Sequence, residues 1–349
     1  MQAPSFPKLT LRIILLIAIG SLAAQAQAPG PFRLVLSNHP GLLTWTADGF
    51  TITEASAKPN GQELGIRSED KSGRIHSLGF LFLTAQSAPQ SAQLTSASCR
   101  DQVLASDKKD NPTLTVLRTS EIPRGPGPSI ALATYTAKGE QGLGYLVRGF
   151  IATADICGDL EFDSLDPISD QDPVLAKIFS TYSFDPAYKP AFTDVLQYAQ
   201  VLVQMENYKA AAPTFDKALV MIPASGAPFA SATVARRIVT DQAGIAYGMA
   251  GDLHKSRQIF ETAITRDPFY PLYYYNLASV DAEQNDLPAA RRHLQQAFAR
   301  KANLNPGESM PDPTTSDSFL LFKDNKPFWT FLESLQTNKV TSPKPEPNK

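Results

Sequence analysis

The stretch from Thr240 to Ala302 reads TDQAGIAYGMAGDLHKSRQIFETAITRDPFYPLYYYNLASVDAEQNDLPAARRHLQQAFARKA, and it repeats itself with a period of 34 residues. The first copy has its apolar and small residues at Thr240, Ala243, Gly244, Tyr247, Gly251, Leu253, Ser256, Phe260, Ala263 and Pro268. The second copy has Tyr274, Leu277, Ala278, Asp281, Asn285, Leu287, Ala290, Leu294, Ala297 and Ala302 in the same slots. A fixed period of this length is typical of stacked helix-turn-helix repeats. The sequence therefore predicts a helical repeat scaffold, without indicating what the scaffold binds.

A third copy of the pattern lies upstream. It comprises Val195, Tyr198, Ala199, Leu202, Glu206, Tyr208, Ala211, Phe215, Ala218 and Pro223, and it starts 45 residues before the copy at Thr240. The spacing implies an insertion of 11 residues, which we place mostly in the small-residue stretch 224–231. Because one hairpin cannot bury its apolar face alone, the three copies are expected to share a core.

The ten slots resemble the tetratricopeptide repeat. The copy that starts at Thr240 keeps six characteristic residues of that pattern, namely Gly244, Tyr247, Gly251, Phe260, Ala263 and Pro268. The upstream copy departs from the pattern at Ala199 and Glu206, and the downstream copy departs from it at Asp281 and Ala302. The resemblance covers residues 191–304 and implies paired helices around a concave groove that binds a partner protein or peptide.

The resemblance also implies which residues line that groove. They are Leu196, Gln200, Ile238, Asp241, Ile245, Leu272, Tyr275 and Ser279. Tyr274 occupies the core slot, so Tyr275, about 100° further around the helix, is expected to reach the groove as an exposed contact residue. Packing of these side chains against neighbouring helices is the alternative. The Lys/Asn/Arg clamp that some members use for a C-terminal carboxylate is absent.

A capping region is expected to follow the array. Asn305-Pro306-Gly307 breaks the pattern, and residues 317–322 and 326–335 then bring several aromatic side chains. We interpret residues 305–338 as capping helices that seal the last repeat, with a loosely attached tail as the alternative. Residues 339–349 are rich in proline and lysine and are expected to be disordered.

In the residues before the repeats, short apolar runs alternate with turn signals, a pattern typical of β-strands. The candidate strands are residues 32–36, 49–55, 63–67, 75–83, 113–118, 130–137, 144–152 and 160–162, and the candidate helices are 91–106 and 173–182. This order predicts an α+β fold with an antiparallel sheet and flanking helices over residues 27–188, followed by all-α repeats over 189–304. Residues 30–185 resemble the PsbP-type fold in the order of their elements.

The N-terminus has the features of an export signal. A basic start with Lys8 and Arg12 precedes a short apolar run and small residues, so we expect cleavage after Ala26 and a periplasmic or secreted protein. An uncleaved anchor is the alternative, and it would be the only contact with a membrane. Cys99 and Cys157 are expected to pair in such a compartment, with two buried free thiols as the alternative.

No pattern in the sequence predicts catalysis. The net charge of −2 supplies no broad basic field for nucleic acid. No histidine has partners at metal-ligand spacing, and no cofactor motif is present, so His254 and His293 are interpreted as solvated side chains. Gly139–Gly144 is interpreted as a hairpin turn. The acidic stretch of Asp159, Glu161, Asp163, Asp166, Asp170 and Asp172 is interpreted as a solvated edge.

These observations favour an exported scaffold that binds a partner protein or peptide through its groove, without an enzymatic activity. The alternative is an α+β domain that binds a small molecule or lipid and is tethered to the repeats.

Overall fold

A computed structural model describes residues 31–84, 94–125, 127–139, 142–153 and 155–337 of the chain. The predicted signal, residues 1–26, and the predicted tail, residues 339–349, lie outside these ranges. The chain divides between Met221 and Ile222 into two compact units, which we call the sheet unit and the helical unit and describe separately.

The first repeat belongs to the sheet unit, so the division lies further along the chain than the predicted boundary at 188/189. This repeat is the hairpin of α4 (Phe192–Gln204) and α5 (Tyr208–Met221). The hydroxyl of Tyr198 on α4 donates hydrogen bonds to the backbone oxygens of Lys58 at 2.6 Å and Glu63 at 2.9 Å. These bonds at the end of a sheet hairpin attach the first repeat to the strands.

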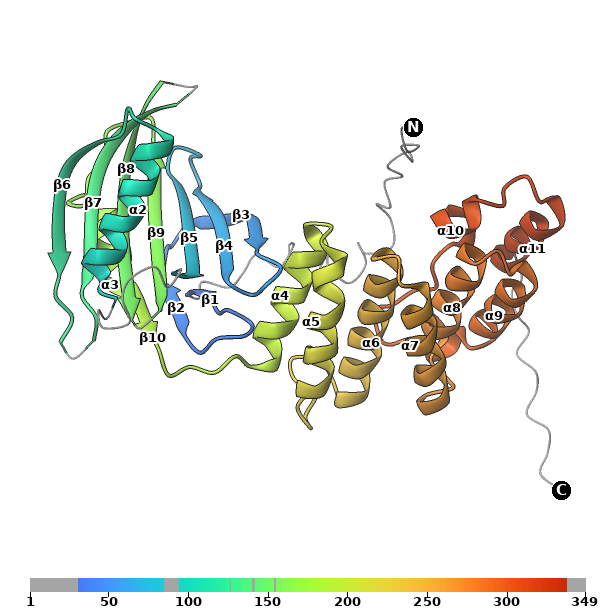
Figure 1. The fold of residues 1–349 in the computed structure, drawn as a ribbon. Helices are drawn as coiled ribbons and strands as arrows, with labels where there is room; N and C mark the ends of the chain where they lie inside the picture. Colours follow the sequence, from blue (N-terminus) through green and yellow to red (C-terminus); the bar gives the residue numbers. More distant parts are fainter. Residues whose placement is uncertain (1–30, 85–93, 126, 140–141, 154, 338–349) are drawn as a thin grey trace, which may run out of the picture. The chain divides into compact units, whose positions relative to one another are not determined.

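The sheet unit is built on a seven-stranded antiparallel sheet (Figure 1). Its strands lie in the order β3 (Phe50–Ala57), β4 (Glu63–Asp70), β5 (His76–Leu83), β9 (Ile156–Ser164), β8 (Gly142–Thr153), β7 (Ile130–Gly139) and β6 (Thr115–Ile122). The predicted hairpin turn is confirmed by the β7–β8 register, which pairs Gly139 with Gly142. The strands β3–β5 and β6–β9 thus each pair in sequence order, and β9 joins the two sets by pairing with β5.

Two short strands were not predicted. β2 (Leu42–Trp45) pairs with β1 (Phe32–Leu34) and with β10 (Ser183–Asp185) in a separate three-stranded sheet. Both missed strands are too short to show an alternating pattern in the sequence. They join the first residues of the sheet unit to those that follow the helix Pro173–Thr181.

Different elements cover the two faces of the large sheet. α2 (Ser96–Asp110) packs on β7 and β8, and a disulfide joins its Cys99 to Cys157 of β9, with 6.4 Å between the two Cα atoms. The next residue, Gly158, faces the opposite side, because successive residues of a strand alternate. On that side lie β2 and α3 (Pro173–Thr181), and the Phe179 ring lies so close to Gly149 that a Cβ there would meet it at 2.4 Å.

The first turn of α2 is closed by a reciprocal cap. The Thr95 hydroxyl accepts a hydrogen bond from the Ser98 backbone nitrogen at 3.1 Å, and the Ser98 hydroxyl accepts one from the Thr95 backbone nitrogen at 2.9 Å. Replacing Thr95 with alanine should remove one partner and lower the free energy of unfolding of the sheet unit by about 1 kcal/mol. Urea unfolding of Thr95→Ala beside Thr95→Ser tests this, since serine keeps the hydroxyl; equal loss in both would contradict the cap.

A buried ionic network ties α2 to the sheet. Arg148 of β8 is 7% exposed, and its guanidinium contacts the carboxylates of Asp107, Asp159 and Glu161. The Tyr135 hydroxyl donates to Glu161 at 3.0 Å and accepts from Arg148 at 3.3 Å. Three carboxylates thus surround one guanidinium between α2 and β9; those of Asp159 and Glu161 lie in the interior, and that of Asp107 is partly exposed.

The prediction of a solvated acidic edge is wrong for the inner residues of that stretch. Asp159 is 1% exposed, and the Asp170 side chain is 5% exposed and accepts a hydrogen bond from Ser120 at 2.8 Å. Only Asp166 keeps the predicted exposure, and Asp172 is half-buried. The physical reason is that Arg148, eleven residues from Asp159 in sequence, lies beside it on the neighbouring strand and compensates its charge.

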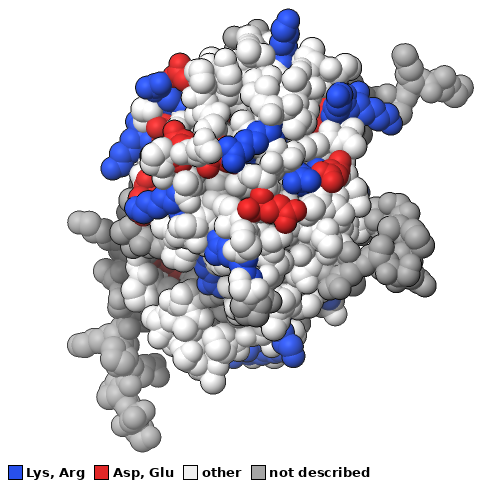
Figure 2. All heavy atoms as spheres, turned by 90° about the vertical axis from the view of Figure 1, so that its left-hand side faces the viewer, with Lys and Arg blue, Asp and Glu red and all other residues white. Residues whose placement is uncertain are grey.

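Charges of both signs are interspersed over the end of the sheet unit where β6 lies (Figure 2). This face therefore carries no broad field of one sign.

The helical unit contains the other two repeats. The second is α6 (Ala232–Met249) with α7 (Leu253–Arg266), and the third is α8 (Pro271–Glu283) with α9 (Leu287–Ala299). α7 and α9 begin 34 residues apart, and the slot residues Phe260 and Leu294 are 1% and 0% exposed. Two short helices, α10 (Asp317–Leu320) and α11 (Lys326–Thr337), then follow at the predicted capping positions. The helical part is therefore tetratricopeptide-like in its repeated helix pairs.

Candidate functional site: the inner surface of the second and third repeats

The resemblance assigns the groove to the first helices of the repeats, so we call the surface formed by α6 and α8 in the helical unit the inner surface. Of the eight residues predicted for the groove, none is exposed in the structure. Leu196, Gln200 and Tyr275 are buried, and Ile238, Asp241, Ile245, Leu272 and Ser279 are half-buried. Leu196 and Gln200 lie on α4 in the sheet unit, whereas the other six lie on α6 and α8.

The expectation of an exposed Tyr275 is wrong. Tyr275 is 0% exposed, and its ring lies edge-on to that of Phe319, with 5.9 Å between the ring centres. Tyr273 and Tyr274 are also buried, at 2% and 5% exposed. All three tyrosines are covered because α8 contacts α6, α7, α9 and a segment that returns from the C-terminal part of the unit.

This returning segment comprises residues Asn303–Phe319. It leaves the third repeat after α9, contacts α6 and the residue before α8, and ends within α10, where Phe319 contacts α8. Its only regular structure before α10 is short 3₁₀ turns. The sequence predicted capping residues here, but not that they would lie on the surface assigned to a partner.

Polar contacts fix the first part of the returning segment. Arg237 of α6 donates hydrogen bonds to the Asn303 backbone oxygen at 3.4 Å and to Asn305 Oδ1 at 3.2 Å. The Tyr270 hydroxyl, just before α8, donates to Glu308 Oε1 at 2.9 Å. Glu308 also accepts hydrogen bonds from the backbone and side-chain nitrogens of Asn305, each at 2.9 Å. One carboxylate thus organises the segment's own turn and anchors it to the repeat.

Apolar contacts fix its second part. Phe319 is 0% exposed and packs in one cluster with Tyr275, Phe328 and Leu332, and Met310 packs at the edge of that cluster. The capping prediction therefore holds for the aromatic residues at 319, 328 and 331, which are all buried.

Asp241 of α6 links the two inner helices. Its Oδ1 accepts a hydrogen bond from Asn276 Nδ2 of α8 at 2.5 Å. Burial raises the pKa of Asp241 to about 7; the negative charge of Glu308 acts in the same direction, and the Asn276 bond opposes them. The sequence pattern did not predict that an aspartate near the returning segment would have a pKa of about 7.

A second polar cluster occupies the slot where tetratricopeptide repeats usually have tyrosine. Asp281 is 0% exposed, and its carboxylate contacts Arg257 Nη2 and His293 Nδ1, each at 2.5 Å. The interpretation of His293 as a solvated side chain is therefore wrong, whereas His254 is exposed as expected. The departure from the pattern at Asp281 was the signal that could have located this cluster.

Among the described residues, no group of histidine, cysteine, aspartate or glutamate side chains is arranged to hold a metal ion. No helix in the described ranges has the length and apolar composition needed to span a bilayer.

Comparison with solved structures returns tetratricopeptide proteins at low identity. The Sgt2 TPR domain from Aspergillus fumigatus is 16% identical, with a TM-score of 0.29, over 46% of this chain and 89% of that one. PcrH from Pseudomonas aeruginosa is 13% identical, with a TM-score of 0.29, over 42% and 92%. The Yersinia enterocolitica secretion chaperone SycD, solved with a peptide of the translocator YopD, is 15% identical, with a TM-score of 0.28, over 41% and 91%.

No family model matches the chain, and no curated protein matches it. The resemblance of residues 30–185 to the PsbP-type fold stays a prediction.

Proposed function

We propose that this protein is a non-catalytic interaction scaffold that binds an extended segment of a partner protein on the inner surface formed by α6 and α8. One observation carries the proposal: this surface already holds an irregular segment of the chain itself, Asn303–Phe319, through Arg237 of α6, Tyr270 before α8 and Tyr275 of α8. A surface built this way offers hydrogen-bond donors at Arg237 and Tyr270 and an aromatic contact at Tyr275.

Binding on this surface requires exchange. A partner segment must displace the returning segment, so the observed affinity is the intrinsic affinity reduced by the cost of opening. Weakening the attachment of the returning segment should therefore strengthen partner binding, about tenfold for each 1.4 kcal/mol of attachment that is lost. This distinguishes exchange from binding elsewhere on the molecule, which would not respond.

Export is part of the proposal, because the first 26 residues have the order of a signal peptide. Determination of the N-terminal residue of the mature protein tests it. A chain that begins at Gln27 in the cell envelope or medium supports export, and a cytoplasmic chain that retains Met1 contradicts it.

The binding test compares three full-length baits. Glu308→Gln/Phe319→Ala loosens the returning segment at both ends, and Leu321→Ala changes an apolar side chain that is 59% exposed, two residues away. Affinity capture should return severalfold more partner with the double variant than with the wild type, and no more with Leu321→Ala.

A competitor makes the test specific. A synthetic peptide of residues 303–320 should release the partner from the double variant, because both occupy the same surface. A melting curve checks that the double variant is folded. Equal capture by all three baits, or capture that the peptide does not reduce, would contradict the proposal.

A further inference from the structure

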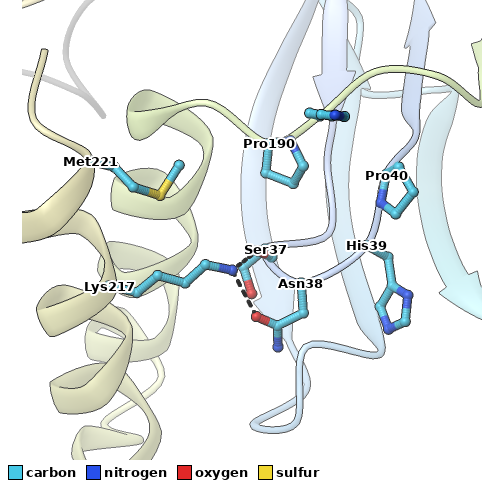
Figure 3. A pocket seen from close by; sticks show the side chains of 8 residues that line it. Ser37, Asn38, His39, Pro40, Pro190, Lys217 and Met221 are labelled. Carbon is cyan, nitrogen blue, oxygen red and sulfur yellow. Dashed lines mark hydrogen bonds between the residues drawn. The ribbon is translucent and has the colours of Figure 1, made fainter.

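A pocket of about 310 Å³ lies within the sheet unit, at the base of the first repeat (Figure 3). It is lined by the loop after β1, by the segment before α4 and by α5, with the residues Ser37, Asn38, His39, Pro40, Lys189, Pro190, Lys217 and Met221. Its volume falls at the lower end of the range for small-molecule sites.

Hydrogen bonds hold the pocket walls in place. The Lys217 ammonium reaches across from α5 and donates to the Ser37 backbone oxygen and to Asn38 Oδ1, the latter at 2.9 Å (Figure 3). The Gly41 nitrogen donates to the Tyr188 oxygen at 2.7 Å, which joins the loop after β1 to the segment before α4. The site is thus formed before any ligand arrives.

The charges that line the pocket are of one sign. Lys189, Lys217 and, when protonated, His39 are cationic, and no acidic residue lines the pocket. Both acceptors of Lys217 are neutral oxygens, and among the described residues no carboxylate pairs with it. An ammonium has three N–H donors, so one remains for a ligand. Burial lowers the pKa of Lys217, which an anion in the pocket would offset.

The remaining walls are apolar. Pro40, Pro190 and the Met221 side chain surround the cationic centre, with Pro190 and Met221 half-buried (Figure 3). Proline rings are rigid, and methionine adapts to the shape of its neighbour, so together they suit a short aliphatic body.

We propose that this pocket binds an organic carboxylate carried on a short apolar body, with Lys217 and Lys189 contacting the carboxylate and Pro40, Pro190 and Met221 contacting the apolar part. The inference is independent of the proposed function, because it concerns a different surface and a different chemistry.

Hexanoate is the probe for this site, titrated into the full-length protein and followed by amide NMR shifts. Saturating shifts are expected at residues 37–41, 189–191 and 217–221. Hexanamide, which lacks the charge, and acetate, which lacks the apolar body, should each bind at least tenfold more weakly. Equal binding of hexanoate and hexanamide would overturn the proposal, as would shifts that do not saturate.

Three variants locate the contact. Lys217→Met should weaken hexanoate binding about tenfold, and Lys217→Arg should restore most of it. Because Lys217 also supports the pocket wall, Lys189→Ala provides a second test of the charge contact. The Lys189 side chain is exposed, so its removal should weaken hexanoate binding a few-fold without altering the fold. Lys209→Met, an exposed lysine on the same helix, is the matched control. Weakening of equal size in Lys209→Met would overturn the assignment.

The carboxylate could belong to a free small molecule or to the C-terminus of a partner chain. A short peptide that ends in leucine, with a free or an amidated terminus, distinguishes these sources. Tighter binding of the free peptide than of hexanoate assigns the site to a chain terminus, and tighter binding of hexanoate assigns it to a small molecule. Both results support carboxylate recognition, whereas equal binding of the free and amidated peptides, together with no hexanoate binding, overturns it.

Discussion

Replacing Arg148 with methionine is expected to lower the free energy of unfolding of the sheet unit by about 3–5 kcal/mol near pH 8. Methionine fills much of the same volume but leaves Asp159 and Glu161 without their cation in the interior between α2 and β9. Burial already raises the pKa of both carboxyl groups while Arg148 opposes that rise, so its removal raises both further.

The pH dependence of the lost stability follows from the direction of these pKa shifts. A carboxyl group whose pKa is raised in the folded state lowers stability as pH rises, because the unfolded chain releases its proton first. The Arg148→Met variant should therefore lose less stability near pH 5 than near pH 8. The measurement is urea unfolding at both values in a Trp329→Phe background, which leaves Trp45, 1% exposed within the sheet unit, as the only tryptophan.

Two further variants separate a buried network from a general effect of losing a charge. Arg67 of β4 pairs with Glu54 at 3.8 Å, and both side chains are about half exposed or more, so Arg67→Met should cost less than about 1 kcal/mol. Adding Asp159→Asn to Arg148→Met should recover part of the loss, because it removes one uncompensated charge. If Arg148→Met cost no more than Arg67→Met, the network would not stabilise the fold as we argue.

The sequence predicted the fold correctly where a periodic pattern of apolar residues extended over a long stretch of chain. The 34-residue spacing located both helix pairs of the helical unit, because slots such as Phe260 and Leu294 must face the same interior in successive hairpins. In β9 the acids Asp159, Glu161 and Asp163 alternate with Leu160 and Phe162 and share one face of the strand, whereas the sequence was interpreted only as a solvated edge. It could not show that this face is covered, because α2 lies more than 40 residues earlier in the chain.

The returning segment could not be placed from sequence for a different reason. Residues 303–316 contain asparagine, proline and glycine without any periodicity, so their position is set by individual contacts such as Tyr270 with Glu308. The resemblance to an open repeat array assigned Tyr275 to a groove as an exposed residue, and the structure buries it. What covers it there, Phe319, comes from beyond the repeats, where the family pattern gives no information.

Replacing Asp241 with asparagine is expected to stabilise the helical unit at neutral pH and to change nothing near pH 4. The pKa of Asp241 is raised to about 7 in the folded protein from an ordinary value of 3.8. Between these values the unfolded chain is ionised while the folded chain keeps its proton, so wild-type stability falls as pH rises. At 1.36 kcal/mol per pKa unit, the gain in Asp241→Asn should approach at most about 4 kcal/mol above pH 7.

Hydrogen exchange of the α8 amides in the full-length protein measures this gain, at pH 5 and pH 8 after correction for intrinsic rates. Asn276 can still donate to the carbonyl of an asparagine at position 241, so the replacement keeps the hydrogen bond seen at 2.5 Å. Asp324→Asn is the control, because it changes an exposed acid outside the inner surface. Asp252→Asn is not suitable, because Asp252 caps α7. A gain at pH 8 that equals the gain at pH 5 would contradict the raised pKa.

The same carboxyl group also reports whether the returning segment is in place. Its raised pKa arises from burial and from the negative charge of Glu308, and the segment supplies that charge. If the segment is displaced, by the Glu308→Gln/Phe319→Ala change or by a bound partner without an acid at that point, the pKa of Asp241 should fall toward 3.8 as water reaches the surface. A carboxyl carbon-13 titration with its midpoint near 7 in the wild type and well below it in the double variant would place Asp241 beneath the segment. An unchanged midpoint would mean that the segment does not cover it, and exchange on this surface would then lose its structural basis.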